Sequence, residues 1–317
     1  MGHGKVKIGS TVFSASNTAT WFGCGFKTPL ELYEKYKGIA PEEQISEESR
    51  KSMAFGTFFE DSVARFYAEQ KGWKIKRCGE TAYWMDEMPY FICHPDRLVI
   101  GKDEEGRRVA LEIKCVSPFA EGWGEEGTED IPDHYYLQVQ SYYACGVPCD
   151  IVHLVCMKGN RITAYPIKRD DDVVDEIRRR VAEAYFSFQK DIVPKTENYD
   201  EATKYYGRRV NQDAEGIGAN DEVLGIYERL IKIHYDQSLL DEQEKSFKKD
   251  LMEKLGDSPA FLSTENGKVK KICYWSATNR TSFDTEALKK DHPEIDLEKY
   301  RTSTQTQTFR VTYPRSK

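Results

Sequence analysis

Two acids and a lysine in the first half of the chain have the types and spacing of a catalytic site. Apolar and charged residues alternate over Val109–Cys115, which predicts a strand with Glu112 and Lys114 on one face. Asp96 follows an apolar segment, and the turn-rich stretch 101–106 predicts a hairpin that returns the chain beside it. We therefore expect the two carboxylates to meet. With a nearby strand carbonyl they form a hard oxygen site for Mg²⁺ or Mn²⁺, where the lysine can orient water or stabilise phosphate charge.

Two predicted helices bring further polar groups to this space. Gly56 and Glu60 are four residues apart and therefore share one helical face. The glycine would let another backbone approach closely, and Glu60 would reach a metal directly or through water. Gln138 and Tyr142 have the same spacing on a later helix and suit a contact with a phosphate or with the lysine.

The elements that must position these residues follow from periodicity and capping signals. Helices are expected at 29–37, 47–70, 134–145 and 170–189. Strands are expected at 74–78, 82–85, 90–93, 98–100, 109–116, 151–157 and 161–167. This order predicts an α/β (α+β) core in which helices flank a central mixed sheet.

The second half of the chain has a different organisation. We expect a core over 1–190, a polar linker over 191–218 and a C-terminal accessory region over 219–317. The accessory region should hold a long helix at 222–255 with one apolar stripe, followed by a small α/β tail: strands at 268–275 and 307–313 and a short helix at 285–290. This region either packs on the core or contacts a partner or another subunit.

Composition excludes several classes of protein. The chain has 317 residues, of which 39% are hydrophobic, so it can bury a core and is not disordered throughout. Its net charge of −7 argues against non-specific coating of nucleic acid. It contains no 18-residue apolar stretch for a membrane span and no secretory signal, so its eight cysteines are expected to be thiols in a reducing cytoplasm.

The ordered motifs resemble those of a known nuclease superfamily. Gly56…Glu60, Pro95-Asp96, Glu112-Ile113-Lys114 and Gln138…Tyr142 are similar to the PD-(D/E)xK nucleases. Two more segments, Ala15-Ser16-Asn17 and the helix opening Thr28-Pro29-Leu30-Glu31, resemble the YqaJ-type branch that is similar to phage lambda exonuclease. The resemblance covers about residues 8–190 and implies a restriction-endonuclease-like core.

The resemblance implies a role for each matching residue. Asp96, Glu112 and the Ile113 carbonyl correspond to metal ligands, Lys114 to the catalytic lysine, and Glu60 to an outer or second-metal acid. Gln138 and Tyr142 correspond to the supporting helix motif. The pocket for the 5′-phosphate of a DNA end is implied at Ser16, Lys5, Lys7 and His94. In that pocket the lysines would replace an arginine of the family, and His94 would contact the phosphate or form a structural hydrogen bond.

The implied activity is Mg²⁺-dependent (or Mn²⁺-dependent) 5′→3′ digestion of double-stranded DNA ends, with Lys114 assisting the attacking water. The remaining 3′ strand would be loaded with a single-strand annealing protein for phage-type homologous recombination, in a bacterial or phage-infected cytoplasm. The family also implies a ring trimer. Three alternatives stay open: an iron–sulfur nuclease of the same superfamily, a restriction-type endonuclease, and a non-catalytic DNA-binding or scaffold protein.

Overall fold

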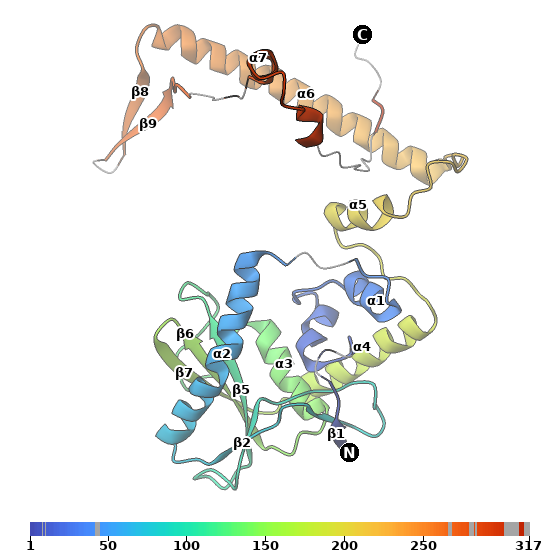
Figure 1. The fold of residues 1–317 in the computed structure, drawn as a ribbon, viewed down its shortest axis with the longest axis vertical. Helices are drawn as coiled ribbons and strands as arrows, with labels where there is room; N and C mark the ends of the chain where they lie inside the picture. The colour runs from blue at the N-terminus through green and yellow to red at the C-terminus, as the bar shows by residue number, and fades with distance from the viewer. Residues whose placement is uncertain are drawn as a thin grey trace. The chain divides into compact units, whose positions relative to one another are not determined.

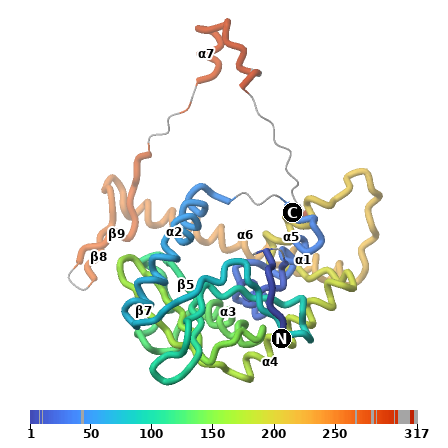
Figure 2. The backbone as a smooth tube through the Cα atoms, turned by 60° about the horizontal axis from the view of Figure 1, so that its bottom comes forward, coloured from blue at the N-terminus to red at the C-terminus, as the bar shows by residue number. Residues whose placement is uncertain are grey.

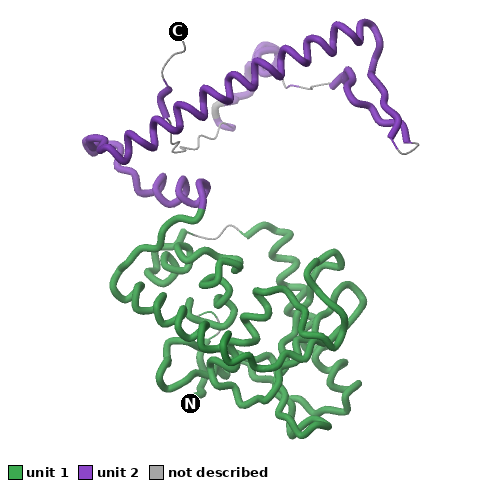
Figure 3. Tube along the Cα trace, turned by 180° about the vertical axis from the view of Figure 1, so that it is seen from behind, with its two compact units in different colours: residues 1–197 green, residues 198–317 purple. Residues whose placement is uncertain are grey.

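A computed structural model gives the fold for most of the chain. It describes residues 1–7, 9, 11–41, 45–265, 268–278, 282, 284–300 and 311–313. The chain divides into two units, residues 1–197 and 198–317, which Figure 3 distinguishes by colour. We describe each unit by itself. Within the described part of the chain, no helix is long and apolar enough to cross a membrane.

A five-stranded mixed sheet forms the centre of the first unit. Its order is β2-β4-β5-β6-β7, in which β5 and β6 run parallel and the other neighbours run antiparallel. The strands are β2 (Ile75–Arg77), β4 (Arg97–Val99), β5 (Val109–Val116), β6 (Ile151–Lys158) and β7 (Arg161–Ile167). The predicted α/β class with a mixed central sheet is confirmed.

Helix α2 (Glu47–Gln70) covers one face of this sheet (Figure 1). Its Val63, Ala64 and Tyr67 pack in one buried cluster with Leu111 and Ile113 of β5. Because side chains alternate along a strand, Glu112 points to the opposite face. Burial of these apolar groups stabilises the layer by about 1.5–3 kcal/mol for each large side chain.

Helix α3 (Asp133–Ala144) contacts Glu112 on that opposite face and is itself covered by further helices. The 3-10 helix η1 (Ala15–Phe22) and α4 (Asp171–Gln189) both pack against α3. Ser141 of α3 donates a buried hydrogen bond of 2.8 Å to Thr18 of η1. The N-terminal segment is thereby docked on the helix that supports the central acid.

The predicted helices of the first unit are confirmed to within a few residues. α1 (Pro29–Lys37) begins at a capping box, in which Thr28 accepts from the Glu31 backbone N–H and the Glu31 carboxylate accepts from the Thr28 N–H. The tube in Figure 2 shows α2 and β5 near one another, as the contacts require.

The predicted strand at 90–93 is wrong. Backbone groups of this segment are divided between two neighbours, which leaves single bridges instead of a ladder. Ile92 bonds with Phe13 and Ala15, whereas Cys93 bonds with Tyr83. The strand that pairs with β3 (Thr81–Trp84) is instead β1 (Gly2–Lys5), for which the sequence offered no alternation signal.

The second unit contains more regular structure than the sequence predicted. Its elements are α5 (Tyr199–Gly207), α6 (Asp221–Leu255), β8 (Ala260–Glu265), β9 (Lys268–Tyr274), α7 (Thr285–Asp291) and η2 (Leu297–Tyr300). The long helix and the short helix are confirmed. The polar linker is wrong over α5, because Asn198 caps that helix and Tyr205 is buried. Strand β8 was missed. Of the predicted strand 307–313, residues 307–310 lie outside the described residues, and 311–313 are not in a strand.

Candidate active site

Glu112 lies at the centre of a buried hydrogen-bond network on β5. The residue is 3% exposed. Gln138 Nε2 donates to Oε1 over 2.7 Å, and the Tyr142 hydroxyl donates to Oε2. Burial and the Glu112 charge raise the pKa of Tyr142 well above its usual value, so the phenol remains a donor. The carboxylate is therefore held in one orientation by two residues of α3.

Lys114 lies beside Glu112 and keeps its positive charge. The ammonium Nζ is 2.7 Å from Glu112 Oε1, and its side chain is 21% exposed. Burial lowers the pKa of Lys114, but the Glu112 charge and hydrogen bond, together with Asp96, outweigh it and leave the pKa raised. The ammonium also lies 5.2 Å from the ring centre of Tyr135, a cation–π contact.

Asp96 reaches β5 from the residue just before β4. Its Oδ2 accepts a 2.7 Å hydrogen bond from the Ile113 N–H. A strand residue presents its N–H and C=O on the same side, so the Ile113 carbonyl also faces this edge. The β4–β5 pairing ends at Arg97 opposite Leu111. If β4 were longer, one of its backbone carbonyls would accept the hydrogen bond from the Ile113 N–H. Here the Asp96 carboxylate accepts it.

Glu60 is engaged on the α2 side of the sheet by a buried arginine. Arg97 is 2% exposed, and its guanidinium contacts Glu60 at 2.9 Å and Asp61 at 3.1 Å. The same group donates to the Asp96 carbonyl at 2.8 Å. Sequence reasoning missed Arg97, because its ion-pair partners Glu60 and Asp61 belong to a helix far away in the sequence.

The donors in this region fit a hard divalent cation. Burial raises the pKa of Asp96 well above its usual range, and the Glu112 and Glu60 charges add to the shift. Negative charge is thus concentrated where a cation would relieve it. Among the described residues no three acidic, histidine or cysteine side chains converge on one position. Two carboxylates and a carbonyl are nevertheless the sparse set that suits Mg²⁺, which keeps several waters.

The N-terminal segment meets the chain just before Asp96. Val6 lies between Lys5 and Lys7, and its carbonyl accepts a 2.9 Å hydrogen bond from His94 Nε2. Both lysines are exposed. Exposed Ser16 is the second residue of η1, and its hydroxyl lies 3.1 Å from that of Ser14. His94 therefore forms a structural hydrogen bond, while the four residues predicted for a phosphate pocket belong to two adjoining segments.

Gly56 does not support a close approach within this chain. A methyl group added at its Cα would meet only Cys115 Cβ, at 4.0 Å, which is ordinary van der Waals contact. The predicted contact of a second backbone at Gly56 therefore has no counterpart among the described residues.

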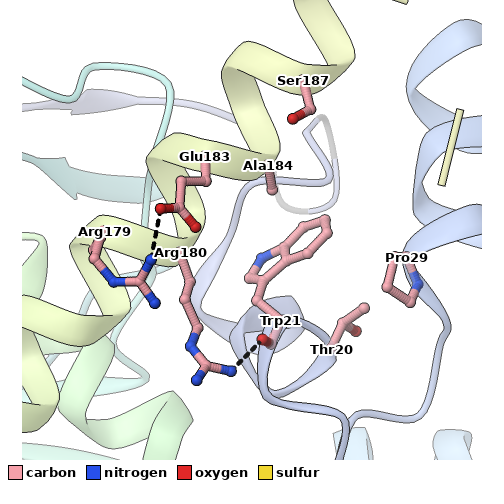
Figure 4. Close-up of a pocket in the computed structure, with 8 residues that line it drawn as sticks. All are labelled: Thr20, Trp21, Pro29, Arg179, Arg180, Glu183, Ala184 and Ser187. Atoms are coloured by element: carbon pink, nitrogen blue, oxygen red, sulfur yellow. Dashed lines mark hydrogen bonds and ion pairs between the residues drawn. The ribbon is translucent and has the colours of Figure 1, made fainter. Parts of the chain in front are cut away.

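A separate cavity of about 320 Å³ lies between η1, the start of α1 and α4 (Figure 4). It is lined by Thr20, Trp21, Pro29, Arg179, Arg180, Glu183, Ala184 and Ser187. Arg179 is ion-paired with Glu183, and Arg180 donates to the Trp21 carbonyl. None of the residues around Glu112 lines this cavity.

A family model matches the part of the chain that carries this site. It describes the YqaJ-like viral recombinase domain and matches residues 6–146. The match covers less than half of the chain. The YqaJ-like domain thus includes β4, β5 and α3, and with them Asp96, Glu112, Lys114 and Tyr142.

One curated protein and several solved structures are similar to this chain. A Bacillus subtilis (strain 168) protein, described as uncharacterized protein YqaJ, is 26% identical over 300 residues, covering 90% of this chain and 86% of its own. The alkaline exonuclease LHK-Exo from Laribacter hongkongensis is 19% identical, with a TM-score of 0.42 over 62% of this chain and 91% of its own. A phage-related exonuclease from Haemophilus somnus 129PT is 14% identical, with a TM-score of 0.40 over 60% of this chain and 96% of its own.

Proposed function

We propose that the chain is a Mg²⁺-dependent exonuclease that digests double-stranded DNA from its 5′ ends. The observation that carries the proposal is the meeting of Asp96, Glu112 and Lys114 at the edge where β4 leaves β5. A mixed sheet with an acid before one strand and Glu-x-Lys on the next resembles the PD-(D/E)xK core. The YqaJ-like viral recombinase domain supports a role in DNA recombination.

The residues have distinct tasks in this chemistry. Asp96, Glu112 and the Ile113 carbonyl would hold Mg²⁺, or Mn²⁺ in its place, which would supply Lewis acidity at the scissile phosphate. Lys114 carries the positive charge that orients an attacking water and offsets charge developing on the phosphate. Gln138 and Tyr142 fix the Glu112 carboxylate, and Glu60 adds an acid at the rim that Arg97 orients.

The proposal extends to the product and the assembly. Digestion of one strand leaves a 3′ single strand, which suits loading of a single-strand annealing protein. A homotrimeric ring, implied by family resemblance, would let a chain of net charge −7 hold DNA, because basic groups need only line the channel.

The deciding experiment compares linear and closed circular duplex DNA, each with Mg²⁺ and with chelator. We expect linear DNA alone to be digested, and only with the metal. Asp96→Ala should abolish digestion, and Asp96→Asn should do so while keeping an oxygen for the Ile113 N–H. Glu104→Ala, an exposed acid in the same hairpin, should digest as the unmodified chain does. Cleavage of closed circles would indicate an endonuclease instead, and Asp96→Asn activity within a few fold of normal would remove the metal assignment.

A further inference from the structure

Helix α6 carries an apolar seam that repeats every seven residues. With Val223 taken as the first position of a heptad, four of the five fourth positions are apolar, and the first positions are apolar at both ends of the helix. The apolar fourth positions are Ile226, Ile233, Leu240 and Phe247, the last fourth position is Lys254, and the apolar first positions are Val223, Leu230 and Leu251. Such a repeat over more than four heptads is typical of a helix that pairs with another helix.

The seam is exposed to solvent in the chain by itself. The side chains at the apolar fourth positions are 51–68% exposed, and those of Val223 and Leu251 are 50% and 44% exposed. Burying a side chain of this size is favourable by about 1.5–3 kcal/mol. A helix of 35 residues is also long enough for a stable coiled coil.

We propose that α6 pairs antiparallel with α6 of a second copy of this chain. The polar residues in the seam decide the direction. A parallel pair would bring Glu244 against Glu244 of the second copy, and Lys254 against its equivalent. An antiparallel pair separates these like charges. It places Glu244, which is ion-paired with Lys248 in its own helix at 2.6 Å, opposite Ile233.

The antiparallel register pairs apolar residues in two of its layers and sets Gln237 opposite Leu240 and Lys254 opposite Val223. Leu230 faces Phe247, and Ile226 faces Leu251, each twice because the pair is twofold symmetric. The acidic first turn of each helix, Asp221–Glu222, lies near the last turn of the other, which carries Lys254. Antiparallel alignment also sets the positive N-terminal end of each helix dipole beside the negative C-terminal end of the other.

Charges beside the seam agree with this direction. Antiparallel helices bring Arg229 of one copy against Asp250 of the other, twice in each pair. A parallel pair would instead set Asp236 against Asp241. On the opposite flank of the seam, Tyr227 donates to the Thr312 carbonyl, and the rings of His234 and Tyr313 stack with their centres 4.0 Å apart. Residues 312 and 313 of the same chain therefore contact that flank.

The first test measures the mass of the full-length chain by sedimentation equilibrium over a range of concentrations. Phe247→Asp should halve the mass, because the proposed α6 pairs join two assemblies of the first unit. Tyr235→Asp is the matched control, because Tyr235 is an exposed aromatic residue of α6 outside the seam. It should leave the mass unchanged. Equal masses for Phe247→Asp and the unmodified chain would overturn the proposal, because the seam would then be covered within one chain or by nothing.

The second test fixes the direction of the pair. Arg229→Asp and Asp250→Arg should each raise the dissociation constant of the α6 pair about tenfold. Each substitution replaces two opposite-charge contacts between the copies with two like-charge contacts. The double variant should restore the original value, since the two charges have only exchanged places. A double variant that associates no better than the single variants would contradict antiparallel pairing. This inference does not depend on the proposed nuclease activity.

Discussion

Lys114 is the residue whose charge matters most to the chemistry. The Glu112 carboxylate and Asp96 keep its pKa raised, so it remains an ammonium throughout the neutral and mildly alkaline range. We predict that Lys114→Ala lowers kcat about 10²-fold, the scale of one electrostatic group, with a much smaller change in KM. Single-turnover digestion of a linear duplex measures both. If kcat of the unmodified chain rises between pH 7 and 9, and this rise is absent in Lys114→Ala, the neutral amine of Lys114 acts in place of the ammonium.

His153 connects pH to the stability of the first unit. It is 7% exposed, shares a 2.8 Å hydrogen bond with the Tyr67 hydroxyl through Nδ1, and has a buried Nε2 that finds no partner among the described residues. Burial, with smaller contributions from Arg107 and Lys71, lowers its pKa to about 4. The unfolded chain takes up this proton near pH 6.5, so stability falls below pH 6.5 until the folded pKa is reached. The loss is about 3 kcal/mol at most.

The test is urea unfolding of the full chain between pH 7 and pH 4. His153→Gln keeps a hydrogen-bonding group for Tyr67 but cannot be charged. It should therefore lack the one-proton slope that the unmodified chain shows in this range. Carboxylates elsewhere contribute equally to both proteins, so the same slope in both would exclude His153 as the cause.

Some residues of the site were predictable and others were not. Alternation along β5 placed Glu112 and Lys114 together, and helical spacing placed Gln138 and Tyr142 on one face, because both depend on local periodicity alone. Tyr135 lies one turn earlier on that same face and could have been found. Arg97 could not, because burial of its guanidinium depends on Glu60 and Asp61, contributed by a helix far away in the sequence.

At the scale of elements, local signals identified α1 to α4 and most strands, and long-range pairing explains the failures. The sequence of segment 90–93 is typical of a strand, yet the segment forms only a single bridge with the chain on each side. β1 is short and glycine-rich, and it is a strand only because β3 pairs with it. α5 lies in a polar stretch where the capping residue Asn198 was the one clear signal.

Helix α2 allows a test of whether DNA approaches it. Gly56 lies in a helical segment with room for a methyl group, so Gly56→Ala should stabilise the chain by about 0.5–1 kcal/mol. If a DNA backbone passes over Gly56, the same variant should lose at least tenfold in kcat/KM. Thermal unfolding and digestion of linear duplex are measured together. Unchanged digestion by the more stable variant would assign Gly56 to no substrate contact.

At the scale of the whole molecule, the N-terminal segment is held against the chain just before Asp96. Ser16, Lys5 and Lys7 lie on segments that bond with residues 92–94, just before Asp96. We predict that a 5′-phosphorylated linear duplex is digested faster than a 5′-hydroxyl duplex, because a monoester marks a DNA end. Ser16→Ala should narrow the difference. Initial nucleotide release at fixed salt measures it. Equal rates for both kinds of end in the unmodified chain would contradict the phosphate-pocket assignment but not the metal-site assignment.

The single parallel pair of the sheet has a consequence for the chain during its synthesis. Strand β5 carries Glu112 and Lys114, but its parallel neighbour β6 is complete only at Lys158, after α3 has been made. Parallel strands need such a crossover, and closing it costs chain entropy before any pairing repays it. A nascent chain that stops short of Lys158 therefore has Glu112 and Lys114 without the complete sheet that positions them. The geometry on which the proposed cleavage depends thus forms only after roughly half of the polypeptide has been made.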